Sequence, residues 1–176
     1  MTNSEAAPTN ISIDQIIISS PFFNEFWIID HSTTTAHASS HFGGIAGKGG
    51  DLLYRWGNPI TYGRGLASDQ KLFFQHDVNW IEEGPYQGKI MVFNNRKGES
   101  YSSVDIIQPP FNSVSGLYDI GVGAYGPSAP NFEYTDNSRE SFFSQNMASA
   151  QALRNGNLLI CSSRQGFFLR LTHLLM

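Results

Sequence analysis

The fold is decided by the stretch Gly88-Lys89-Ile90-Met91-Val92-Phe93-Asn94-Asn95, followed by Ser102-Ser103-Val104-Asp105-Ile106-Ile107. Each half is a short run of aliphatic, β-branched and aromatic residues, and small or polar residues bound it. Such runs are typical of β-strands. The two halves therefore predict an antiparallel pair of strands.

The same pattern occurs twice more. It appears as residues 14–20 followed by 25–30, and as 157–163 followed by 166–171, with Ile16, Ile90 and Leu158 in equivalent positions. Four further strands are expected beside these pairs, at residues 51–56, 75–81, 131–134 and 148–153. Each unit then contains up to four consecutive strands, which is the make-up of a β-propeller blade.

We therefore expect an all-β fold, a partial β-propeller of about two and a half four-stranded blades. Residues 1–176 would form one partial propeller domain, with blade portions at roughly 13–60, 75–135 and 147–172. The first unit lacks its first strand and the third lacks its last, so the chain is expected to be a slice of a larger protein whose remaining blades are missing. Open strand edges predict low stability of the isolated chain.

Composition excludes several classes of protein. The chain has 176 residues, 11 basic against 15 acidic, and only 15% charged residues with 13% aromatic ones, unlike a disordered acidic tail. The net charge of −4 argues against a nucleic-acid partner. No stretch approaches the ~20 apolar residues of a membrane span. Residues 1–10 show no secretory signal, and the single cysteine, Cys161, is expected in the core.

The candidate for chemistry is His76, within Gln75-His76-Asp77 at the start of the first strand of the middle unit. In a propeller the first strand of each blade borders the central channel, so the imidazole is expected to face that channel. Ala148 stands at the comparable offset in the third unit. A neutral imidazole serves as base, nucleophile or ligand. The alternative is a histidine hydrogen-bonded into a turn.

Other polar groups have a structural and a functional interpretation. Arg96 and Arg164 each follow the second strand of a unit, where a guanidinium can meet an oxyanion or remain on a solvated surface. His37 and His41 would share a metal if their segment were helical, but the glutamate of a zinc-protease motif is absent. A Ser/Thr-rich polar loop around His31, His37 and His41 is the preferred interpretation, and we expect no metal and no cofactor.

Several stretches resemble bacterial aryl-sulfate sulfotransferases. They are residues 14–19 with 27–35, 49–59, 75–77 with 80–81, 92–95 and 155–161. The resemblance implies a six-bladed propeller that moves a sulfuryl group from an aryl sulfate donor to a phenolic acceptor through a sulfohistidine, without a nucleotide donor. His76 corresponds to the nucleophile. Asp77 or Asn95 would fix its tautomer, and Arg96 is a candidate to stabilise the sulfuryl oxygens.

The chain departs from that family in three places. The second catalytic histidine should lie upstream of Asp14, where residues 1–12 contain none, and the family's arginine would fall at Pro21. Residues 169–176 also differ from the expected strand. Family members are exported, and the missing signal is consistent with truncation. A sulfotransferase fragment with little activity alone is therefore expected; the alternative is a non-catalytic propeller segment that serves as a binding scaffold, or an inactive truncated relic.

Overall fold

The structure is a computed structural model that describes residues 14–98, 100–121, 123–162 and 166–172. The histidine-free segment 1–12, Arg164 and the last residues of the divergent C-terminal stretch lie outside these ranges. The described helices contain only three or four residues each, and none is long enough to cross a membrane.

The described residues confirm the all-β prediction, and their strands form three larger antiparallel sheets and one two-stranded sheet. The first sheet has the order β1-β2-β3, from Gln15–Ser20, Glu25–Asp30 and Tyr54–Trp56. The second has the order β4-β5-β6-β9, from His76–Trp80, Ile90–Gly98, Tyr101–Ile107 and Phe132–Tyr134. The third has the order β10-β11-β12, from Ser149–Ala152, Leu158–Ser162 and Phe167–Leu171.

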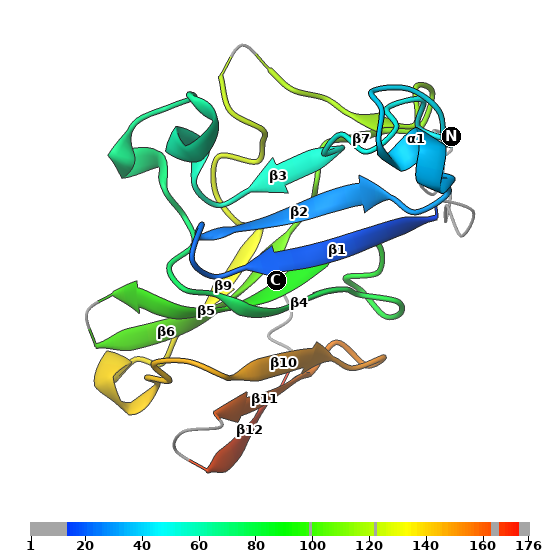
Figure 1. The fold of residues 1–176 in the computed structure, drawn as a ribbon. Coiled ribbons are helices and arrows are strands. Elements are labelled where there is room, and N and C mark those ends of the chain that lie inside the picture. The colour runs from blue at the N-terminus through cyan, green and yellow to red at the C-terminus, as the bar shows by residue number, and fades with distance from the viewer. Residues whose placement is uncertain (1–13, 99, 122, 163–165, 173–176) are drawn as a thin grey trace, which may run out of the picture.

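Figure 1 shows the three sheets stacked as layers, with the four-stranded sheet in the middle. The side chains of β5 alternate between two apolar cores, and the four-stranded sheet therefore lies between the other two sheets. Ile90 and Val92 belong to the core shared with the first sheet, whereas Met91 and Phe93 belong to the core shared with the third. A continuous apolar run is therefore needed in β5, since both of its faces are covered.

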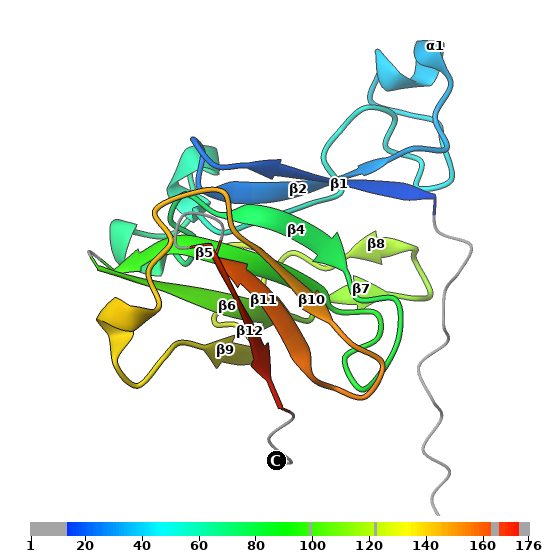
Figure 2. The ribbon, with the colours of Figure 1, turned by 90° about the horizontal axis from the view of Figure 1, so that it is seen from below.

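The long connections carry small elements of their own. The segment between β2 and β3 contains α1 (Thr35–Ala38) and stands away from the sheets in Figure 2. The segment between β6 and β9 contains a hairpin of β7 (Phe111–Asn112) and β8 (Leu117–Tyr118). Short 3-10 helices occur at Pro59–Tyr62, Ala67–Asp69 and Arg139–Ser141.

One end of the stacked sheets collects most of the candidate residues. Because the strands are antiparallel, the 21–24 turn, the 57–75 connection, the end of β5 and the 141–148 connection all lie at this end. We call it the site end. Hydrogen bonds join its segments: Asn24 contacts Phe74, and Asn95 contacts Ser144.

Candidate functional site

His76 is the first residue of β4, opposite Phe93 of β5, and its side chain is partly buried at the site end. Its Nδ1 lies 2.8 Å from Asn95 Oδ1 and 3.2 Å from the backbone oxygen of Phe74. Both neighbouring atoms are acceptors, so Nδ1 must carry the proton in order to bond either one. The neutral ring therefore presents an unprotonated Nε2.

The orientation of the Asn95 amide is fixed by a second contact. Its Nδ2 donates to the backbone oxygen of Ser144 at 2.8 Å, and this leaves Oδ1 facing the imidazole. Asn95 is fully buried, and the hydroxyl of Ser102 donates to its backbone oxygen at 2.6 Å. A buried and fully bonded amide is a rigid support for a neighbouring ring.

The adjacent Asn94 performs a different task because successive strand residues face opposite sides. Its Oδ1 accepts from the backbone N–H of Phe73 at 2.8 Å, and its Nδ2 donates to the backbone oxygen of Lys71 at 2.8 Å. Asn94 thus anchors the chain that leads into β4, while Asn95 holds the imidazole at the start of the strand.

Asp77 does not contact His76. Its Oδ2 accepts from the backbone N–H of Ala150 at 2.8 Å, which links β4 to β10. Of the two residues predicted to fix the tautomer, Asn95 is therefore the one in place. Asp77 has a left-handed backbone (φ 52°) and lies in an irregularity of the β4–β5 pairing. A β-bulge of this kind re-aims side chains and is frequent next to functional sites.

The bulge also corrects the comparison between units. Ser149 of β10 pairs with Cys161, whose place in β11 corresponds to that of Phe93 in β5, the partner of His76. Ser149, and not Ala148, is therefore the counterpart of His76. The offset predicted from the sequence was wrong because β4 contains one residue more than β10 over the same paired length.

Phe74 is a site residue that the sequence did not reveal. Its backbone is left-handed (φ 55°), and its N–H donates to Asn24 Oδ1 at 2.7 Å. Its ring packs edge-to-face with His76 at a centroid distance of 5.4 Å. Nothing in a Phe-Phe-Gln-His string signals a positive φ, which a bulky residue rarely adopts.

Arg96 completes the group around Phe74. Its guanidinium carbon lies 4.0 Å from the centre of the Phe74 ring, and its Nε donates to the backbone oxygen of Gln145 at 3.2 Å. The residue is exposed, and within the described ranges no carboxylate pairs with it. His76 and Arg96 thus contact the same phenyl ring.

Gln75 ties this group to the first sheet. It is fully buried, and its Nε2 donates to the backbone oxygen of Glu25 at 2.5 Å. Its Oε1 is buried without a hydrogen-bond partner among the described residues. Leaving a buried amide oxygen unpaired is costly to the stability of the fold.

A buried acid lies behind Asn94. Asp105 of β6 is fully buried, and its Oδ2 accepts from Asn94 Nδ2 at 3.1 Å. Burial raises the pKa of Asp105 to about 6, against the opposing effect of Lys97. Asp105 supports Asn94, which anchors the chain leading into β4, and it titrates within the physiological pH range.

The other histidines do not form a metal site in the described part of the chain. His31 Nδ1 lies 2.7 Å from Asp14, and His41 Nδ1 lies 2.7 Å from Asp51. Helix α1 ends before His41, so His37 and His41 do not share one helical face. No cluster of three or more potential ligands occurs among the described residues.

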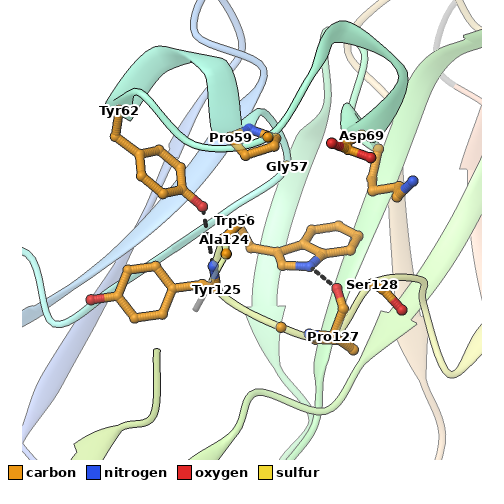
Figure 3. A pocket seen from close by; sticks show the side chains of 13 residues that line it. Trp56, Gly57, Pro59, Tyr62, Asp69, Ala124, Tyr125, Pro127 and Ser128 are labelled. Atoms are coloured by element: carbon orange, nitrogen blue, oxygen red, sulfur yellow. Dashed lines mark hydrogen bonds between the residues drawn. The ribbon is translucent and has the colours of Figure 1, made fainter. Parts of the chain in front are cut away.

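Two hollows border the connections and strands described above. A cleft of about 340 Å³ lies between the 57–71 and 123–128 segments, and Figure 3 shows the side chains that line it. There the Trp56 indole N–H donates to Pro127 O and the Tyr62 hydroxyl accepts from Tyr125 N–H, so these groups join the two segments. No histidine or cysteine is among the residues that line this cleft.

A wider hollow of about 470 Å³ lies along β4 and β10 and is lined in part by Asp77, Ser149 and Cys161. Cys161 is only partly buried, so its expected place in the core was wrong. The hollow extends from Asp77, the residue after His76. The hollow therefore borders β4 directly after His76, and His76 itself does not line it.

Comparisons of the chain with family models, curated proteins and solved structures find no match. Any function assigned to His76 therefore depends on its own geometry and on the stretches of sequence around it.

Proposed function

We propose that the protein is an aryl-sulfate sulfotransferase in which His76 is the nucleophile. The observation that carries this proposal is the pair of acceptors, Asn95 Oδ1 and Phe74 O, facing Nδ1. They hold the ring in the tautomer whose Nε2 has a free lone pair. A histidine held in this tautomer is suited to covalent catalysis.

In the first half-reaction, Nε2 of His76 attacks the sulfur of an aryl sulfate. The N–S bond forms, the bond between sulfur and the aryl oxygen breaks, and the phenolate leaves. In the second half-reaction, the oxygen of an acceptor phenol attacks the same sulfur, the N–S bond breaks, and the acceptor's proton passes to solvent. No electrons are exchanged and no cofactor is needed.

The surroundings of His76 support both steps. Positive charge develops on the imidazole as Nε2 attacks, and the two oxygens at Nδ1 stabilise it by accepting the N–H. The guanidinium of Arg96 is exposed and lies over the Phe74 ring. It supplies a permanent cation for the sulfuryl oxygens. Asp77 supports the site only indirectly, through the hydrogen bond that its carboxylate accepts from Ala150 of β10.

We further propose that the three sheets are neighbouring blades of a β-propeller. The four strands of the middle sheet are adjacent in sequence order apart from the β7–β8 hairpin, and the sheets stack face to face. Strand β4 lies beside β10, its counterpart in the third sheet, as the innermost strand of a blade would. This arrangement would direct the start of β4 toward a central channel.

The proposal is tested by incubating the full chain with 4-nitrophenyl sulfate and phenol and following the release of 4-nitrophenolate. We expect slow release that depends on phenol and falls to the background rate in His76→Ala. His37→Ala is the matched control, because His37 lies on α1, away from the site end. Release that is unchanged in His76→Ala would reject His76 as the nucleophile.

A further inference from the structure

We propose that Phe22, Phe74 and Arg96 form a binding site for an aromatic anion, with the aryl ring on Phe22 and the anionic group on Arg96. We call these three residues the aryl platform. The inference rests on the proposed function for the class of ligand, an aryl sulfate donor, and it assigns the residues that would hold that donor.

The exposure of Phe22 is the first observation. The side chain is 87% exposed, in the turn between β1 and β2, and its ring meets the Phe74 ring edge to face at 5.4 Å. A phenyl ring held in water by a contact with one other ring leaves most of its apolar surface available for a ligand.

The second observation is the charge beside this surface. The Arg96 guanidinium lies 4.0 Å from the centre of the Phe74 ring, and in the described ranges no acidic side chain neutralises it. An exposed aromatic surface next to an unpaired guanidinium is complementary to a molecule that carries an aryl group and an anionic oxygen group. A neutral phenol has the aryl group but no anionic group for the Arg96 guanidinium.

The third observation is the backbone of Phe74. A left-handed conformation is rare and unfavourable for a phenylalanine, and the Asn24 side chain holds it there through the Phe74 N–H. The strained conformation places one ring in contact with Phe22, Arg96 and His76. Among the described residues, Phe74 is therefore the one side chain that contacts the exposed ring, the cation and the proposed nucleophile alike.

The test measures binding of 2-naphthalenesulfonate, which has no transferable sulfuryl ester, to the full chain by isothermal titration calorimetry. We expect Phe22→Ala to weaken binding about threefold to tenfold, from the loss of one aromatic contact. Arg96→Gln should weaken it by a similar factor but leave binding of neutral 2-naphthol unchanged. Phe42→Ala is the matched control, because Phe42 is also exposed (69%) but lies in the α1 connection.

The outcomes separate this inference from the catalytic proposal. Binding that is weakened by Phe22→Ala and Arg96→Gln, and kept in His76→Ala, supports the aryl platform whether or not sulfuryl transfer occurs. The inference is overturned if Phe22→Ala binds the sulfonate as tightly as Phe42→Ala, or if the wild type does not bind at millimolar concentration. Both phenylalanines are exposed, and thermal unfolding of each variant verifies that it is folded.

Discussion

At the scale of single residues, the decisive contact is that between His76 Nδ1 and Asn95 Oδ1. Nitrogen-15 NMR of the imidazole should show the proton on Nδ1 in the wild type at neutral pH. In Asn95→Ala the Phe74 oxygen alone remains, so we expect a mixture of both tautomers. A wild-type ring protonated at Nε2 would contradict the assignment of the nucleophilic atom.

Asp105 makes the stability of the protein depend on pH. Its pKa is about 6 in the folded protein against an ordinary 3.8, so the folded state holds the proton more tightly than the unfolded chain does. The wild type should therefore lose stability as the pH rises from about 4 to about 6, by on the order of 3 kcal/mol. The loss is complete above that range.

The matched variant for this prediction is Asp105→Asn, which cannot ionise and keeps an oxygen for Asn94 Nδ2. Urea unfolding at pH 5 and pH 7.5 should show a smaller decrease in the free energy of unfolding for the variant than for the wild type. Equal decreases in the two proteins would mean that Asp105 is not the group responsible.

At the scale of elements, the positions of the strands could be predicted from the sequence, because runs such as Ile90–Phe93 alternate between two apolar cores. A contact of His76 with Asn95 or Asp77 was also predicted from the motif stretches, and the contact with Asn95 is present. The bulge at Asp77, the left-handed Phe74 and the counterpart Ser149 were not predicted. Each depends on contacts between segments that are far apart in the sequence. The conformational propensities of neighbouring residues do not predict such contacts.

The bulge itself should be held by the bond from Ala150 N–H to Asp77 Oδ2. Asparagine keeps an acceptor and tolerates a positive φ, whereas alanine provides neither. We therefore expect Asp77→Ala to lower the free energy of unfolding by about 1–2 kcal/mol relative to Asp77→Asn. Urea unfolding measures this difference. Equal stability of the two variants would show that the β4–β10 link contributes nothing.

At the scale of the whole molecule, the outer faces of the stack are exposed. Ile16 and Ile18 of β1 are 40% and 37% exposed, and Phe168 of β12 is 73% exposed. Sheets with uncovered apolar faces and open edge strands lack part of the burial that stabilises stacked repeats. We therefore expect low thermal stability of the isolated chain. A sharp unfolding transition of a monomer above roughly 60 °C would be inconsistent with this view.

The central claim, a covalent role for His76, is tested most directly by trapping the intermediate. The chain is incubated with 4-nitrophenyl sulfate without an acceptor, quenched at alkaline pH, digested and mapped by mass spectrometry. We predict an acid-labile sulfuryl group on the peptide that contains His76, absent from His76→Ala and reduced in Asn95→Ala. A label on any other residue, or an unlabelled wild type, would contradict the claim.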